Sequence, residues 1–167
     1  DYGGSGVIYL LGGCAALGSL LGLRKEIPSD LSHGPEKMPP SHFPLLANLG
    51  ALLFGLGSLG WSLSSPFHVG GASVTLPRTA VNALLAAAGA VLASQLYCWF
   101  TTGRADPLMS ARGLAAGFVA IGAGAAFIPP WAAVVTGIVA GTLLPLTVYV
   151  EDHLLRLRDA HGQKRHH

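Results

Sequence analysis

The residues best suited to proton transfer or metal binding are seven histidines, and no pattern among them indicates a site. None has a Cys or carboxylate partner at the spacing of a zinc site. The segment HGPEKMPPSHF, which holds two of them, is proline-rich and typical of a rigid connection. We therefore expect no bound metal. All seven fall in predicted connections or in the C-terminal tail: His33, His42, His68, His153, His161, His166 and His167.

The chain also shows no arrangement of side chains that would support an enzyme. The sequence contains neither a nucleophile–base pair nor a phosphate-binding loop. Three amides lie within apolar stretches: Asn48, Asn82 and Gln95. Such amides usually form hydrogen bonds between membrane helices, although in principle they can also ligate a pigment metal. We expect a protein that is not an enzyme and that binds no cofactor and no nucleic acid.

These amides belong to five long apolar stretches that contain no Lys, Arg, His, Asp or Glu. A helix needs about 20 apolar residues, at about 1.5 Å of rise each, to cross a bilayer. The chain is 51% hydrophobic and only 11% charged, whereas soluble domains carry about 25% charged residues. The sequence thus predicts an all-α integral membrane protein rather than a soluble helical core. The bundle would occupy residues 1–150, with spans at about 2–23, 44–66, 79–102, 113–129 and 130–150.

The positive charge between the spans predicts the orientation of the chain. Of the 10 Lys and Arg residues, nine lie in the connections and the tail on one side of the spans. Only Arg78 lies in a connection on the other side. By the positive-inside rule, the basic side and the C-terminus face the cytoplasm, matrix or stroma, and Asp1 lies outside. The basic inner rim also favours anionic lipid headgroups. That rim holds Arg24, Lys25, Lys37, Arg104, Arg112, Arg156, Arg158, Lys164 and Arg165.

Glycines spaced four residues apart predict close helix packing. Three such pairs are Gly18/Gly22, Gly113/Gly117 and Gly137/Gly141. Small residues at this spacing let two membrane helices approach at backbone distance. We expect helix packing to be the role of these glycines, with a ligand groove as the alternative.

The two ends of the chain carry further expectations. Residues 151–167 form a basic tail in which EDHLLRLRDAH resembles an interfacial helix that extends the fifth span. The chain does not begin with methionine, so we expect that an upstream segment was removed or is not included.

Several motifs resemble those of the ammonium transporter/Rhesus family. The chain opens with DYGGSGVIYLLGGCAAL, which is similar to the family's fifth membrane helix, D-F-A-G-G-T-V-V-H-I. It continues with MPPSHFPLLANLGALLFGLGSLGW, which is similar to the P-H-N-L-P loop and the sixth helix. Residues 79–141 are similar to helices seven to nine. These motifs occur in the family's order and extend to about Val150.

The resemblance implies part of an eleven-helix bundle that is usually trimeric. The family builds this bundle from two inverted five-helix repeats with an ammonia-conducting pore between them. This chain corresponds to helices five to nine only, so helices one to four and helix ten would be missing. The family's pore histidine on helix five aligns with Tyr9, and its partner on helix ten lies beyond this chain. A phenol keeps its proton near neutral pH and cannot shuttle protons as an imidazole does.

The resemblance also assigns four further pore positions. The phenylalanine gate of helix six aligns with Trp61, which still offers an aromatic face to a cation. Its neighbouring asparagine aligns with Ser62, and the serine that helps recruit ammonium aligns with Ser65. The helix-five aspartate matches Asp1. Ser65 and Asp1 suit polar caps on helix ends better than recruitment. We expect all these positions to be vestigial.

Two functions are consistent with the sequence. The first is a non-transporting, ammonium-transporter-like subunit with a structural role in a larger respiratory, photosynthetic or ATP-synthase complex. Its partners would be other membrane subunits and lipids. The second is half of a split or partial ammonium channel, completed by another polypeptide that carries the missing helices. Only the second would bind ammonium, and the lost pore histidine and the missing helices favour the first.

Overall fold

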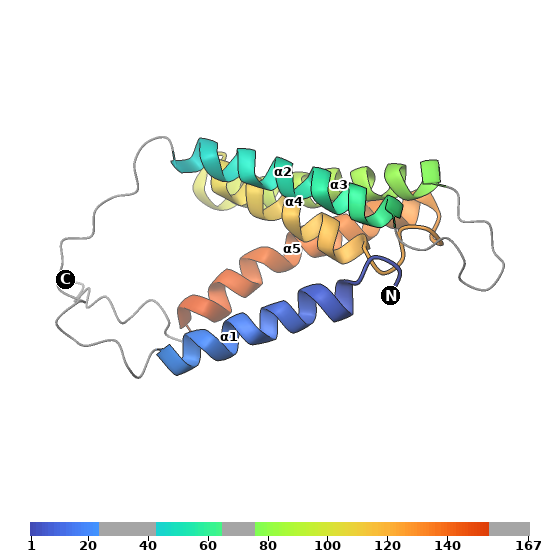
Figure 1. Cartoon of the computed structure of the whole chain (residues 1–167). Coiled ribbons are helices and arrows are strands. Elements are labelled where there is room, and N and C mark those ends of the chain that lie inside the picture. Colours follow the sequence, from blue (N-terminus) through green and yellow to red (C-terminus); the bar gives the residue numbers. More distant parts are fainter. Residues whose placement is uncertain (24–42, 65–75, 154–167) are drawn as a thin grey trace, which may run out of the picture.

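The computed structural model is a bundle of helices and describes residues 1–23, 43–64 and 76–153 (Figure 1). The described residues contain no strand, which confirms the all-α class. In chain order the elements are the π-helix η1 (Ser5–Leu10), α1 (Leu11–Leu23), α2 (Phe43–Ser64), α3 (Leu76–Thr102), α4 (Pro107–Ile121) and α5 (Pro130–His153).

Three of these helices are long and apolar enough to cross a membrane. They are Phe43–Leu63, Leu76–Thr102 and Pro130–Thr147, in α2, α3 and α5. Two other apolar helices of the described chain, Ser5–Ser19 and Pro107–Ile121, are shorter. These two correspond to the first and fourth expected spans.

The fourth helix differs most from the sequence-based expectation. We expected it at residues 113–129, but α4 begins at Pro107 and ends at Ile121. The early start follows from Asp106, whose carboxylate accepts a hydrogen bond from the Leu108 N–H at 2.9 Å, with proline at the first helical position. Arg112, expected in the connection, therefore lies within α4. After Ile121 the chain forms turns up to the start of α5.

The other helices begin and end near the expected positions. The first begins at Ser5 rather than at residue 2, because the preceding residues form a turn. α5 extends to His153, three residues into the expected tail. The rest of that tail, residues 154–167 with the expected interfacial helix, lies outside the described residues, as does the first basic connection.

Glycine and alanine bring α3 and α5 together at backbone distance. Ala86 and Ala90 of α3 have no exposed surface. Gly137 lies against Ala86, and Gly141 lies against Ala90, so closely that a Cβ on either glycine would overlap the backbone of α3. Contacts of this kind hold membrane helices together where no hydrophobic effect acts between them. The predicted packing role of this glycine pair is confirmed.

The second glycine pair packs α4 against the neighbouring side of α3. A Cβ on Gly117 would lie 2.6 Å from Ala87 Cα, and one on Gly113 would lie 3.1 Å from Val91 Cα. Gly113 also faces Ser94, which has no exposed surface. α3 therefore contacts both α4 and α5 through small residues.

α1 stands apart from this bundle. Among the described elements it contacts only η1, and Figure 1 shows it at the lower edge, away from α2 and α3. Gly18 and Gly22 have open space where a Cβ would lie. The third predicted glycine pair therefore has no packing partner in the described part of the chain.

The three amides within apolar stretches all join helices to other elements. Asn48 of α2 donates to the Pro107 carbonyl at 2.9 Å. Gln95 of α3 donates to the Asp106 carbonyl at 2.6 Å and to Ser110 Oγ. Asn82 donates to two carbonyls of the segment between α4 and α5. The predicted hydrogen bonding between helices is confirmed for Asn48 and Gln95, whereas Asn82 bonds to the irregular segment between two helices.

Candidate functional site

Tyr9, the residue aligned with the family's pore histidine, faces α2. It lies in the π-helix η1, and its hydroxyl oxygen is 3.4 Å from Ser58 Oγ. Its ring meets the Phe54 ring edge-on, with centroids 6.0 Å apart. The phenol therefore bridges the first membrane segment to the second through one polar and one aromatic contact.

The contacts of Tyr9 define one face of α2. Phe54 and Ser58 are four residues apart and Trp61 follows three residues later, so all three lie on the same side of the helix. Trp61 is 55% exposed. We call Tyr9, Phe54, Ser58 and Trp61 the Tyr9 face. The sequence analysis missed Phe54 and Ser58, although their spacing to Trp61 would have indicated them.

Ser62, the residue that follows Trp61, lies on a different side of α2. It is only 8% exposed, and it is seven residues from Gly55, which packs against Phe118 of α4. Residues seven apart lie on nearly the same side of a helix. The structure thus places Ser62 toward α4, away from Tyr9, so the two neighbouring pore positions of the alignment do not share a surface.

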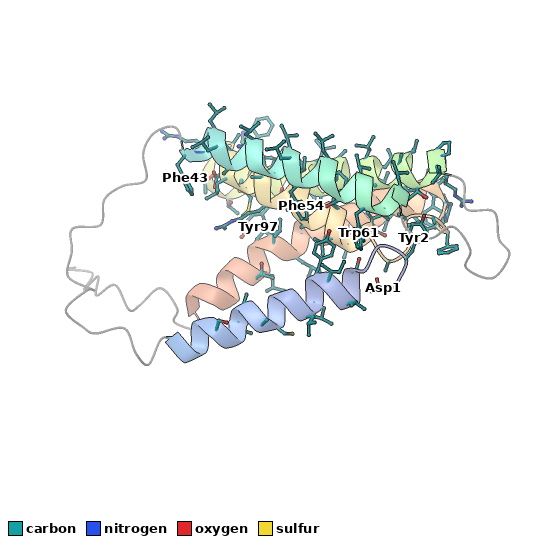
Figure 2. All side chains as sticks on the ribbon, in the orientation of Figure 1. Asp1, Tyr2, Phe43, Phe54, Trp61 and Tyr97 are labelled. Atoms are coloured by element: carbon teal, nitrogen blue, oxygen red, sulfur yellow. The ribbon has the colours of Figure 1, made fainter. Side chains whose placement is uncertain are left out.

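Asp1 caps the start of η1. Its Oδ2 accepts hydrogen bonds from the backbone N–H groups of Gly6 at 3.0 Å and Val7 at 3.1 Å. A carboxylate in this position satisfies helix N–H groups that have no intrahelical partner. Figure 2 shows Asp1 and Trp61 toward one end of the structure and Phe43 and Tyr97 toward the other.

The N-terminal segment is attached to the end of α4. Gly3 N–H donates to the Gly122 carbonyl at 2.6 Å, and Ser5 Oγ donates to the Val119 carbonyl at 2.7 Å. The Tyr2 ring meets Phe127 edge-on with centroids 5.9 Å apart. A Cβ on Gly3 would lie 2.6 Å from the Gly122 oxygen, so this approach requires glycine. These contacts fix the position at which η1, and with it Tyr9, begins.

Ser65, the remaining expected site residue, lies outside the described residues. Within the residues that the structure describes, no group of three or more His, Cys, Asp or Glu side chains is placed to hold a metal ion.

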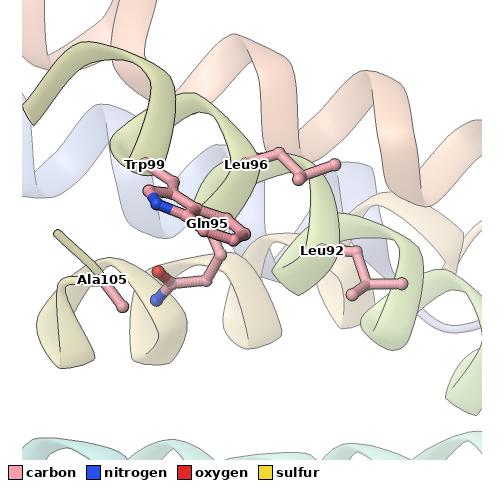
Figure 3. Close-up of a pocket in the computed structure, with 5 residues that line it drawn as sticks. All are labelled: Leu92, Gln95, Leu96, Trp99 and Ala105. Carbon is pink, nitrogen blue, oxygen red and sulfur yellow. The ribbon is translucent and has the colours of Figure 1, made fainter. Parts of the chain in front are cut away.

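A groove of about 360 Å³ lies elsewhere, along α3 and the start of the α3–α4 connection. Figure 3 shows its lining side chains, which are apolar apart from the Gln95 amide and the indole N–H of Trp99. That amide already donates to Asp106 and Ser110. The groove includes no residue of the Tyr9 face. It is lined by Leu92, Gln95, Leu96, Trp99 and Ala105.

The Tyr9 face combines aromatic rings with hydroxyl groups and carries no ionisable side chain other than the phenol. Aromatic faces attract cations by about 0.5–2 kcal/mol, and hydroxyls both donate and accept hydrogen bonds. Such a surface suits a small polar solute or a compact cation that loses part of its water.

The helices are apolar, pack closely through glycine and are joined by hydrogen bonds from amide side chains. These features define an integral membrane protein of the helical-bundle class. The model of the Ammonium Transporter Family matches the chain over residues 1–167. The chain belongs to this family.

Curated relatives support the same assignment. The chain is 35% identical over 141 residues to the ammonium transporter Amt2 of Archaeoglobus fulgidus, covering 84% of this chain and 30% of that protein. It is 30% identical over 159 residues to Amt1 of Methanocaldococcus jannaschii, covering 95% and 39%. Ammonium transporter 1 member 2 of Oryza sativa is 30% identical over 154 residues, covering 86% and 31%.

The chain therefore spans about a third of the length of the curated relatives it matches. No solved structure gives a significant match.

Proposed function

We propose that this chain contributes part of the conduction path of an ammonium transporter. The observation that carries the proposal is the family match over residues 1–167, together with relatives that are named ammonium transporters. It favours the second reading of the sequence, a segment of an ammonium channel. Nothing in the comparisons supports the first reading, a non-transporting structural subunit.

The Tyr9 face is the part of the path that this chain would supply. Trp61 and Phe54 would offer aromatic faces to ammonium as it loses water, because removing a cation from water is costly unless other groups attract it. The hydroxyls of Tyr9 and Ser58 would then hydrogen-bond to the nitrogen. Because this face carries no histidine or carboxylate side chain, we assign any proton acceptor on the path to residues outside it.

The relatives of this chain are about three times as long as the part that it matches. We therefore propose that the remaining walls of the path come from membrane segments outside this chain. We further propose the orientation that the charge distribution favours, with Asp1 outside and the C-terminus on the cytoplasmic, matrix or stromal side. The basic inner rim would contact anionic lipids.

Uptake of methylammonium tests the proposal. The protein, with all flanking sequence its natural gene encodes, is expressed in cells that lack ammonium transporters. We expect uptake above that of cells with an empty vector, and we expect Trp61→Ala to reduce it severalfold. Trp99→Ala is the matched control, because Trp99 is also exposed but lies on the groove of α3. Absence of uptake, with the protein present in the membrane, would overturn the proposal and favour the structural subunit.

A further inference from the structure

The segment between α4 and α5, residues 122–129, is partly buried irregular backbone beside the first turns of α3. α4 has 15 residues, which rise about 22 Å, less than the roughly 30 Å of a bilayer core. The irregular segment thus occupies part of the depth that a longer helix would have crossed. Gly122, Ala125 and Ala126 are buried in it. Irregular backbone inside a membrane protein needs donors from other parts of the protein.

α3 supplies donors to one side of this segment. Asn82 is completely buried, and its Nδ2 donates to the carbonyls of Ala125 and Ile128, both at 2.8 Å. Arg78, one turn earlier, donates to the carbonyls of Ile128 at 3.2 Å and Phe127 at 3.3 Å. Of these two residues, Asn82 reaches the interior carbonyl of Ala125, while Arg78 is exposed.

The N-terminal segment supplies donors to the other side. Gly3 N–H donates to Gly122, and Tyr2 N–H donates to the Ala123 carbonyl at 3.2 Å. Two residues after Gly3, Ser5 begins η1, which carries Tyr9. Residues 122–129 therefore receive hydrogen bonds from α3 and from the chain just before Tyr9, and they connect the two.

We propose that Asn82 is a positioning residue for Tyr9. Its amide holds residues 122–129 against α3, and these residues in turn hold Gly3 and the start of η1. The position of Tyr9 beside Ser58 thereby depends on the Asn82 side chain of α3, although Asn82 bonds to neither residue. The functional consequence rests on the proposed role of Tyr9 in ammonium conduction, whereas the structural dependence does not.

Hydrogen–deuterium exchange of the purified protein in mild detergent tests the structural dependence. Asn82→Asp removes the two-donor amide at nearly constant volume, and Asn82→Leu replaces it by an apolar group. We expect roughly tenfold faster exchange at the backbone amides of residues 2–10, which would report local opening of this segment.

Asn48 provides the matched control. Its Nδ2 likewise donates to two carbonyls, those of Pro44 at 2.8 Å and Pro107 at 2.9 Å, but it has no link to residues 122–129. Asn48→Asp and Asn48→Leu should leave exchange at residues 2–10 unchanged. Unchanged exchange in the Asn82 variants, or an equal increase in the Asn48 variants, would overturn the proposal.

Gly3→Ala tests the second step without altering Asn82, and it serves if the Asn82 variants fail to fold. The new Cβ would lie 2.6 Å from the Gly122 oxygen, so the backbone must separate there. We expect faster exchange at residues 2–10, while the amides of Gly124, Phe127 and Ile128, which bond to carbonyls in their own turns, keep their protection. Exchange at residues 2–10 equal to that of the unmodified protein would contradict the proposed connection.

Uptake measurements test the functional consequence separately. Per molecule in the membrane, Asn82→Asp should lower methylammonium uptake severalfold, and Asn48→Asp should not. If exchange changes as expected but the unmodified protein shows no uptake, the positioning of Tyr9 stands and the proposed function fails. If the unmodified protein transports but exchange at residues 2–10 does not change in the Asn82 and Gly3 variants, the positioning proposal fails alone.

Discussion

The hydroxyl oxygen of Tyr9 lies 3.4 Å from Ser58 Oγ, which joins the π-helix η1 to the last third of α2. Either hydroxyl can donate this bond, so the pair retains one free O–H donor and unused acceptor lone pairs on both oxygens. The Tyr9 ring also packs edge-on against Phe54, with centroids 6.0 Å apart. Tyr9 therefore acts on the site through hydrogen bonding and packing.

Removing either hydroxyl should have the same modest effect on stability. Tyr9→Phe keeps the edge contact with Phe54 but loses the bond to Ser58, and Ser58→Ala loses the same bond from the other side. We expect each to lower the free energy of unfolding by about 0.5–1.5 kcal/mol. The double variant should cost less than the sum, which thermal or denaturant unfolding in detergent will measure. Strictly additive effects would mean that the two hydroxyls do not interact.

Asp1 should stabilise the protein through its capping oxygen. Asp1→Ala removes the acceptor for the N–H groups of Gly6 and Val7 and should cost about 0.5–2 kcal/mol. Asp1→Ser keeps an oxygen that can cap, and it should recover most of that loss in the same unfolding measurement. A recruitment role would instead reduce uptake at low ammonium concentration equally in both variants.

A larger side chain should destabilise the protein at the buried Gly137 but not at the exposed Gly18. Gly137→Leu places atoms where the Ala86 backbone already lies, so we expect loss of the folded protein or a large fall in melting temperature. Gly18→Leu adds a side chain where nothing lies within 4 Å, and it should leave the melting temperature nearly unchanged. Fluorescence size-exclusion chromatography after heating compares the two.

The same comparison reports on the surroundings of α1. If Gly18→Leu proves as damaging as Gly137→Leu, the surface of α1 around Gly18 and Gly22 would have to be covered in the membrane by a segment other than the described helices.

The proposed orientation predicts opposite accessibility for the two ends of α3. Pro77→Cys and Arg104→Cys are placed singly in a background where Cys14 and Cys98 are replaced by alanine; both substituted positions are exposed. A maleimide that does not cross membranes should label the Pro77→Cys variant in intact cells. It should label the Arg104→Cys variant only after the membrane is opened. The reverse pattern would show that the basic rim faces outward.

Much of the fold could be predicted from the sequence because membrane helices are determined locally. An uncharged apolar stretch satisfies its own backbone when it is helical, so the bounds of α2, α3 and α5 were close to those expected. α4 was harder to place because two local signals conflicted. Hydropathy favoured a start after Arg112, whereas the Asp106 cap and Pro107 begin the helix earlier.

The candidate site could be predicted only in part. Resemblance indicated Tyr9 and Trp61, but it also grouped Trp61 with Ser62, which the helix turns toward α4. Helical spacing places Ser58 on the same side of α2 as Trp61, but its contact with Tyr9, 49 residues away, could not be predicted because no pattern in either segment refers to the other.

By itself the sequence determined which segments are apolar helices, which glycines suit close packing and which family the chain resembles. Each of these depends on the composition of a single stretch or on the order of stretches. Only the tertiary structure decided that Asn82 binds residues 122–129, that the Gly137/Gly141 pair meets α3 while Gly18 and Gly22 meet nothing described, and that Tyr9 faces Ser58. These pairings depend on how helices distant in sequence rotate against one another, and that rotation is set by the fit of all their surfaces together.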